Sequence, residues 1–187
     1  TLFTEGKVYH FDVRSLVWHG ITVYFVDYPE YFMRDGLYSN AYDAYEDNGE
    51  RFSFFSGAVL QTLQALSFTP DVIHCHDWHT AMLPYLLNHE RSGFFEQTKT
   101  VFTIHNAAFQ GVHSLEKIPF LRHHPHIFSQ VHGGYINMLQ TGIECASKVT
   151  TVSPNYADEL LTDLGSHGLH ERLVKRKADL SGILNGC

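Results

Sequence analysis

The chain of 187 residues is long enough for one domain with a sizeable core, and its 44% apolar and 18% charged residues are typical of a globular protein. Its formal net charge of -7 argues against nucleic acid or an anionic membrane as the main partner, because both favour basic surfaces. Cys75, Cys145 and Cys187 are scattered without a CxxC pair, and no apolar run approaches the roughly 20 residues that cross a bilayer. We therefore expect a reducing compartment, either a cytosol or a plastid-like compartment.

The first elements are predicted to be β-strands. Residues 7–14 and 21–28 are rich in β-branched and aromatic side chains, and we expect them to pair as a hairpin. Residues 29–48 form a loop dense in Tyr, Asp and Asn, among them Tyr38 and Tyr45. Such a loop either contributes to a binding site or packs on its own tyrosine rings at the surface. The sequence leaves both interpretations open.

A helix is predicted from residue 50 to residue 66, with Asn48 as its N-cap. Its apolar residues recur at steps of three and four, which is typical of an amphipathic helix. We expect this stripe to face the core; its members are Phe52, Phe55, Val59, Leu63 and Leu66.

Strands and helices alternate after residue 70. The predicted strands are residues 71–76, 100–105, 148–152 and 181–184, and the predicted helices are residues 78–90, 135–146, 168–177 and one that starts at Pro154 with Ser153 as its N-cap. Residues 107–130 read as a looser, His-rich insertion. This alternation predicts an α/β fold with a largely parallel, Rossmann-like sheet.

Polar side chains gather where two of these strands end. The run HCHDWH, residues 74–79, closes the first strand, and His105 and Asn106 close the next. Because the carboxyl ends of parallel strands form one edge where ligands bind, we expect the two groups to share a site.

Two chemistries are open for this cluster. His74, His76, Asp77 and His79 are metal-ligand types, as in a metal-dependent hydrolase, although their HxHDxH spacing differs from the HxHxDH run of such enzymes. Alternatively, His74 has a structural role, in which it is buried, neutral and hydrogen-bonded at the sheet edge. Neither a GxSxG elbow nor a glycine-rich phosphate loop occurs in the sequence.

The second chemistry is sugar binding. Aromatic rings stack on the apolar faces of a pyranose, while carboxylates and amides bind its hydroxyls. The predicted edge offers both kinds of group: Asp77, Trp78, His79, His105, Asn106 and Asn185.

Several segments resemble the N-terminal domain of the bacterial glycogen synthase and plant starch synthase family. They are YEDNGERFSFFSGAVL from Tyr45, PDVIHCHDWHTAMLPYLL from Pro70, TVFTIHNAAFQG from Thr100, GIECASKVTTVSPNYADEL from Gly142 and GILNG from Gly182. They occur in the family's order and extend over most of the chain from Tyr31 onward.

The resemblance implies a retaining glucosyltransferase with a two-domain GT-B fold. Such an enzyme moves glucose from a nucleotide sugar, usually ADP-glucose, to the non-reducing end of an α-1,4-glucan. It implies no metal and no cofactor, and a site in the cleft between the domains. The partners implied are therefore the glucan and the nucleotide sugar.

The resemblance also implies roles for individual residues. His105 matches the residue that contacts the donor glucose at the reaction centre, and Asn185 matches an amide near the transferred sugar. Asp77, Trp78, Asn106 and Tyr45 match the acceptor side of the cleft. Among these we expect Asp77 and His105 to be catalytic.

The match further implies that residues 1–187 are part of the N-terminal, acceptor-side domain. The family's amino-terminal K-x-G-G-L segment and its C-terminal nucleotide-sugar domain have no counterpart in the sequence. We therefore expect no synthase activity from this chain alone, and an exposed sheet edge that can pair with another copy. A metal-dependent hydrolase and a non-catalytic glucan-binding module remain the alternatives.

Overall fold

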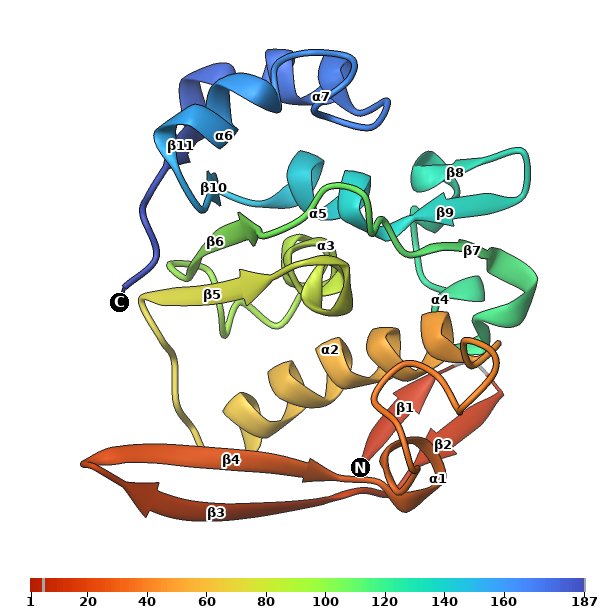
Figure 1. The fold of residues 1–187 in the computed structure, drawn as a ribbon. Coiled ribbons are helices and arrows are strands. Elements are labelled where there is room, and N and C mark those ends of the chain that lie inside the picture. The colour runs from red at the N-terminus through yellow and green to blue at the C-terminus, as the bar shows by residue number, and fades with distance from the viewer. Residues whose placement is uncertain (5, 187) are drawn as a thin grey trace.

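The computed structural model describes residues 1–4 and 6–186 (Figure 1). Its centre is a four-stranded parallel sheet in the order β11-β10-β6-β5. The strands are β5 (Val72–His76), β6 (Lys99–Ile104), β10 (Lys148–Thr151) and β11 (Leu180–Gly182). The predicted parallel sheet is confirmed, with each strand within two residues of its expected bounds.

Three helices build the core. α2 (Asn48–Ala65) packs against α3 (Met82–Asn88), and α3 packs against α5 (Met138–Cys145). α5 lies so close to the sheet that a Cβ atom on Gly142 would come within 2.7 Å of the Phe102 ring of β6. Glycine at this position therefore sets the distance between helix and sheet.

Two shorter helices accompany the last strands. α6 (Pro154–Glu159) contacts β10 and β11, and α7 (His170–Lys175) contacts α5. The predicted cap of α6 is confirmed, since the Ser153 hydroxyl accepts a hydrogen bond from the Tyr156 N–H at 3.0 Å. A 3₁₀ turn, η4 (Lys177–Asp179), leads from α7 to β11.

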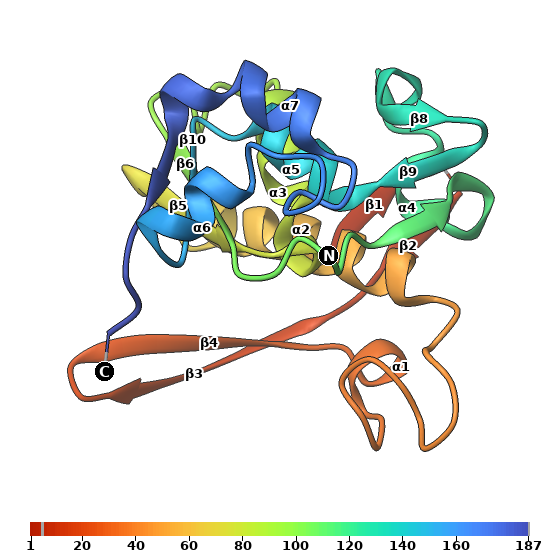
Figure 2. The ribbon, with the colours of Figure 1, turned by 45° about the horizontal axis from the view of Figure 1, so that its top comes forward.

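The amino-terminal part is antiparallel. β1 (Leu2–Thr4) pairs with β2 (Lys7–Tyr9), and β3 (Asp12–Trp18) pairs with β4 (Ile21–Asp27). The predicted strand over residues 7–14 is thus divided between β2 and β3, and the expected hairpin is β3–β4. His19 and Gly20 at its tip both have positive φ, as a two-residue type I′ turn requires. In Figures 1 and 2 this hairpin stands apart from the parallel sheet.

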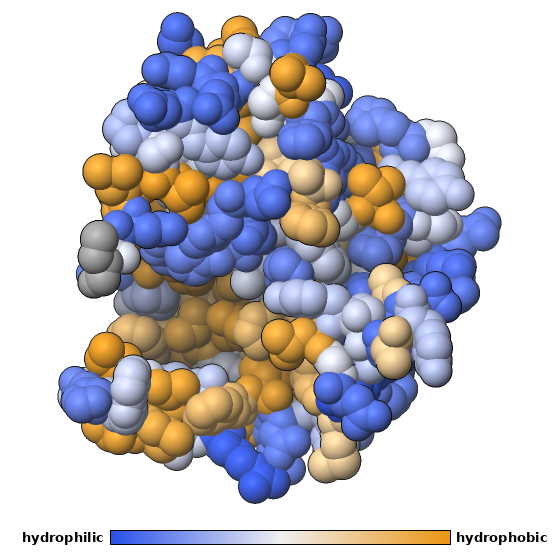
Figure 3. All heavy atoms as spheres, in the orientation of Figure 1, coloured by the Kyte–Doolittle hydropathy of each residue, from blue (hydrophilic) through white to orange (hydrophobic). Residues whose placement is uncertain are grey.

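A hollow separates the hairpin from the parallel sheet in the space-filling view (Figure 3). Apolar residues line this hollow. Many hydrophobic side chains of the hairpin are exposed, including Val17, Trp18 and Ile21. In the described part of the chain β5 has a strand neighbour on one side only. Within this part of the chain β5 and β11 are therefore the two edge strands of the parallel sheet.

The segments that were predicted as loops contain short elements. The first loop holds α1 (Pro29–Phe32), and the His-rich insertion holds η2 (Leu115–Lys117), α4 (Pro119–Arg122) and η3 (Ile127–Gln130). A small antiparallel sheet in the order β7-β9-β8 joins β7 (Val112–Ser114), β8 (Val131–His132) and β9 (Tyr135–Asn137). The predicted helix over residues 135–146 consequently begins only after β9.

The buried face of α2 differs from the predicted stripe. Phe54, Ala58 and Leu60 are buried, whereas Leu66 is exposed and Phe52 is only partly covered. The helix contacts several elements at once, namely α3, α4, β1, β4 and the 3₁₀ turn η1 (Trp78–Thr80). The prediction is therefore confirmed only in part: Phe52, Val59 and Leu63 pack against the core while partly buried, and the predicted stripe omits the fully buried residues.

The predicted N-cap of α2 is also wrong. Asn48 is the first residue of the helix, and its side chain donates to the Tyr38 carbonyl at 2.8 Å instead of capping. Asn48 therefore ties the Tyr-rich loop to the start of α2.

A buried carboxylate fastens the amino-terminal strands to α2. Glu50 accepts hydrogen bonds from the hydroxyls of Tyr9 at 2.6 Å and Tyr31 at 3.0 Å, and from the Phe120 N–H at 2.9 Å. Burial, aided by the nearby Glu50 charge, raises the pKa of both tyrosines. These bonds connect β2, α1 and α4 to one point on α2, since buried polar groups need partners.

In the part of the chain that the structure describes, no helix has the length and apolar character to span a membrane.

Candidate functional site at the carboxyl edge of the parallel sheet

The ends of β5 and β6 lie side by side. The register pairs His76 with Thr103, and the Asp77 N–H donates to the Thr103 carbonyl at 2.9 Å. His105 and Asn106 follow directly after β6. The two polar groups that the sequence assigns to one edge are therefore neighbours in the structure.

Asp77 has a strained backbone. Its φ of 55° and ψ of -177° lie in a region that residues with a side chain seldom occupy. The Thr80 hydroxyl stabilises this turn, because it accepts from the His76 N–H at 2.6 Å and donates to the His76 carbonyl at 2.8 Å. Strain of this kind costs about 1–3 kcal/mol and concentrates at functional sites.

The Asp77 carboxylate connects the two strand ends. Its Oδ1 atom accepts from the His105 backbone N–H at 2.8 Å. Asp77 also lines a cavity of about 540 Å³ at this edge. A single carboxylate thus orders the chain at His105 and presents charge to the cavity.

The cavity lies between the Tyr-rich loop and the segment after β6. Its lining is Tyr38, Ser39, Ala44, Asn48, Asp77, Trp78, His79, Asn106, Ala108, Phe109, Gln110, Gly111, Val112 and His113. Two aromatic side chains of this wall are open to solvent, Tyr38 with 47% and Phe109 with 65% of their surface exposed. Exposed rings beside amides and a carboxylate are the groups that bind a sugar.

Trp78 is a buried part of this wall. Only 8% of its surface is exposed, and its indole packs edge-on against Phe52 at 5.1 Å between ring centroids. A Cβ atom on Gly111 would lie 2.4 Å from the indole. The open indole face that the sugar interpretation favours is absent, and Trp78 instead shapes the wall from within.

His79 and Asn106 both line the cavity, as the sequence predicts. The His79 ring stacks on Tyr38 with centroids 4.7 Å apart. Burial lowers the pKa of His79, against an opposing effect of the Asp77 charge. The Asn106 Oδ1 atom accepts from the Ala108 N–H at 2.9 Å, which orients its amide at the start of the loop.

His105, Tyr45 and Asn185 lie outside the cavity lining. His105 is exposed beside it, with its backbone held by Asp77. Tyr45 lies against the guanidinium groups of Arg34 and Arg51, at 4.8 Å and 5.2 Å from its ring centroid. Asn185 is exposed beyond β11, which β10 and β6 separate from β5.

The three histidines of the HCHDWH run do not meet at one point, because only His74 and His76 have neighbouring rings, with centroids 4.1 Å apart. The His74 ring contacts Thr103 Oγ1 through Nε2 at 2.6 Å, whereas His79 is stacked in the wall with Tyr38. Among residues 1–4 and 6–186, no three His, Cys, Asp or Glu side chains are arranged to hold a metal ion. The hydrogen bond predicted for His74 is present, but the ring is exposed rather than buried.

Sequence reasoning did not assign Tyr38 and Phe109 to the site. Tyr38 belongs to the Tyr-rich loop, whose composition alone does not identify which ring reaches a ligand. Phe109 lies within the TIHNAAFQG segment, three residues after Asn106, so its position in the motif was the available signal.

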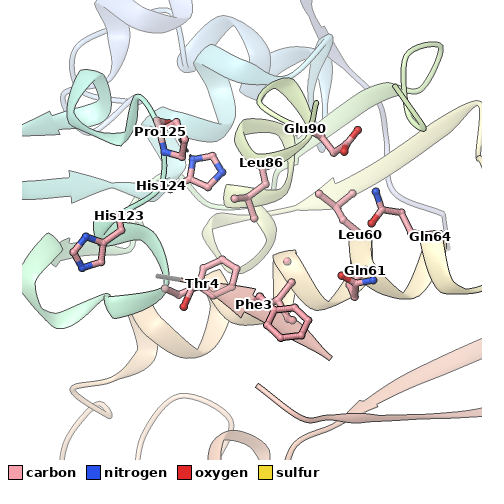
Figure 4. A pocket seen from close by; sticks show the side chains of 13 residues that line it. Phe3, Thr4, Leu60, Gln61, Gln64, Leu86, Glu90, His123, His124 and Pro125 are labelled. Carbon is pink, nitrogen blue, oxygen red and sulfur yellow. Dashed lines mark hydrogen bonds between the residues drawn. The ribbon is translucent and has the colours of Figure 1, made fainter. Parts of the chain in front are cut away.

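A second cavity, of about 400 Å³, lies between β1, α2, α3 and the chain around His124 (Figure 4). Phe3, Leu60 and Leu86 contribute apolar surface, and Gln61, Gln64 and Glu90 contribute polar groups. No residue from the carboxyl ends of the parallel strands lines it. The strained Asp77 lines the first cavity, which we therefore take as the candidate site.

The fold and the site define an α/β protein with a Rossmann-like sheet and a ligand site at its carboxyl edge. The family model of the starch synthase catalytic domain matches residues 2–175. The chain belongs to this family. Its resemblance to glycogen and starch synthases is thereby confirmed.

Individual relatives agree with this assignment. A glycogen synthase of Vibrio cholerae is 50% identical over 173 residues, which are 90% of this chain and 36% of the relative. A glycogen synthase of Aeromonas hydrophila is 45% identical over 186 residues, 97% of this chain and 37% of the relative. The chain spans about a third of the length of these relatives.

A solved structure supports the fold. The catalytic domain of starch synthase IV from Arabidopsis thaliana, bound to ADP and acarbose, matches with a TM-score of 0.84 and 30% identity. The match covers 97% of this chain and 38% of that one. The predicted α/β, GT-B fold class is confirmed.

Proposed function

We propose that this chain forms the acceptor side of a retaining glucosyltransferase that extends an α-1,4-glucan from ADP-glucose. Family membership supports the reaction class, and relatives that share about half of its residues are glycogen synthases. The starch synthase neighbour was bound to ADP and acarbose, a nucleotide and a saccharide. The observation that carries the proposal is the strained Asp77, hydrogen-bonded to His105 beside an aromatic-lined cavity.

The cavity binds the acceptor glucan. The exposed rings of Tyr38 and Phe109 stack on pyranose faces, and Asn106 and His79 bind hydroxyls. Trp78 supports the wall from behind. The roles of Tyr45 and Asn185 rest on the family motif alone. Tyr45 belongs to the acceptor cleft, and Asn185 lies near the transferred sugar.

In the reaction, the bond between glucose C1 and the diphosphate oxygen breaks, and the acceptor O4 bonds to C1 on the same face. The proton of the acceptor hydroxyl leaves with the departing phosphate. Asp77 and oriented backbone dipoles stabilise the positive charge that develops on the sugar, and His105 contacts the donor glucose. The proposal requires neither a metal nor another cofactor.

The proposal extends to partners and compartment. Glucan and nucleotide sugar are the small-molecule partners, and the enzyme acts in the bacterial cytoplasm or in a plastid. The edge of β5, which has one strand neighbour among the described residues, pairs with a second copy of the chain. Light scattering tests this last point, since a monomer at all concentrations would contradict it.

The test is an assay of the complete reading frame that encodes this chain, with ADP-glucose or UDP-glucose and a maltooligosaccharide acceptor. We expect transfer with ADP-glucose preferred, and no transfer by the 187-residue chain alone. Two results would contradict the proposal. Zinc bound to the purified protein with hydrolytic activity would favour the hydrolase, and maltooligosaccharide binding without transfer by the complete protein would favour a glucan-binding module.

A further inference from the structure

The rings of His76 and His105 contact each other through nitrogen atoms. His76 Nδ1 lies 3.0 Å from His105 Nε2, which is hydrogen-bond distance. His76 is the last residue of β5 and pairs with Thr103, and His105 follows the end of β6 two residues after Thr103. Both residues keep much of their surface exposed, although the His76 ring is partly shielded from solvent.

A hydrogen bond between two imidazoles needs one proton between the nitrogens. One ring donates and the other accepts, so at least one of the two must be neutral. The bond therefore fixes the orientation of the His105 ring and couples its tautomer to that of His76. When both rings are protonated the two nitrogens are both donors, and the contact is lost.

The surroundings keep His76 available as the neutral partner. Burial lowers the pKa of His76, and His74 and His105 lower it further, while Asp77 opposes them. The His74 ring lies 4.1 Å from that of His76 between centroids. Asp77 meanwhile holds the backbone of His105. His105 is thus held twice, at its main chain and at its ring.

We propose that His76 is a positioning residue that holds the His105 imidazole in the orientation and tautomer in which it meets the donor glucose. The inference rests on the proposed glucosyl transfer, in which His105 contacts that sugar. It assigns His76 a role in the reaction rather than a purely structural one.

Three variants of the complete protein separate positioning from folding. His76→Leu removes the ring nitrogen, whereas His76→Asn keeps a side-chain amide near the Nδ1 position that does not titrate. His74→Leu is the matched control, because His74 lies on the same face of β5 but bonds to Thr103 rather than to His105.

The first measurement is kcat and KM for ADP-glucose between pH 5.5 and 8.5. We expect His76→Leu to lower kcat about tenfold, the loss of one positioning hydrogen bond, and to change KM far less. His76→Asn should recover most of kcat and shift the acid limb of the pH profile, and His74→Leu should stay within about twofold of the unmodified protein at pH 8. An unchanged kcat in His76→Leu would overturn the proposal.

The second measurement is the ¹⁵N chemical shifts of the His105 ring in the 187-residue chain. At pH 8 they should move far more in His76→Leu than in His74→Leu, and unchanged shifts in His76→Leu would overturn the proposal without reference to activity. If the proposed function is wrong instead, the unmodified complete protein will show no glucose transfer. The ring nitrogens would still decide whether His76 holds His105.

Discussion

The carboxylate of Asp77 accepts a hydrogen bond from the backbone N–H of His105 at 2.8 Å, across the ends of two neighbouring parallel strands. Asp77 keeps this bond at a φ of 55° and a ψ of -177°, where glycine is far less strained. The turn is held by Thr80, whose hydroxyl bonds to both backbone groups of His76. An aspartate side chain at this position therefore carries a conformational cost.

The strain at Asp77 is measurable in the 187-residue chain. Asp77→Gly and Asp77→Ala both remove the carboxylate, but only the alanine variant keeps a Cβ atom at positive φ. We expect the glycine variant to have a free energy of unfolding about 1 kcal/mol above that of the alanine variant in chemical denaturation. An alanine variant equal to or more stable than glycine would contradict the strain.

The wall of the cavity depends on Gly111. A Cβ atom there would lie 2.4 Å from the Trp78 ring, and φ is +62°. Gly111→Ala should therefore displace the indole, lower the free energy of unfolding and weaken maltooligosaccharide binding.

Gly93→Ala is the control for Gly111→Ala, because its φ is +78° but nothing lies within 4 Å of the added atom. The Gly111 variant should lose about 1–3 kcal/mol more than this control, the usual cost of overpacking. Equal losses in the two variants would mean that Trp78 moves freely.

Acid should destabilise the fold. Burial lowers the pKa of His76, His79, His113 and His124. Below the unfolded value of about 6.5 the unfolded chain binds protons at these positions that the folded chain does not, so stability falls as the pH falls. The contribution is fully present above that value and is lost as the pH falls through the lower, folded-state values.

Thermal unfolding between pH 8 and pH 5 measures this effect. His113→Gln should lessen the acid loss in Tm, because a partly buried ring that takes up a proton on unfolding is removed. The exposed His132→Gln is the control and should follow the unmodified chain. A Tm that rises on acidification would contradict the account.

The sequence predicted the parts of the fold that depend on local patterns. The apolar strands ending in His76 and His105, and the Ser153 cap, follow from periodicity and capping, and the structure contains them. The buried face of α2 does not follow from periodicity. Several elements pack on this helix, so that Phe54 and Glu50, which lie outside the predicted stripe, are buried. Local periodicity carries no information about a second packing surface.

The site was predicted to a similar extent. The strand ends place Asp77 and His105 together, as parallel topology requires. The exposure of Trp78, Tyr38 and Phe109 could not be predicted, because it depends on how the loop after β6 folds over the indole at Gly111. An aromatic residue in a motif can equally be a ligand platform or a buried support.

Steady-state kinetics of Asp77→Ala in the complete protein tests the central claim most directly. Because Asp77 is proposed to stabilise charge that develops only in the transition state, its removal should lower kcat by about 100-fold or more and change KM for ADP-glucose little. Circular dichroism of the variant establishes that it is folded. An unchanged kcat in a folded Asp77→Ala protein would contradict the assignment of this edge as the glucosyl-transfer site.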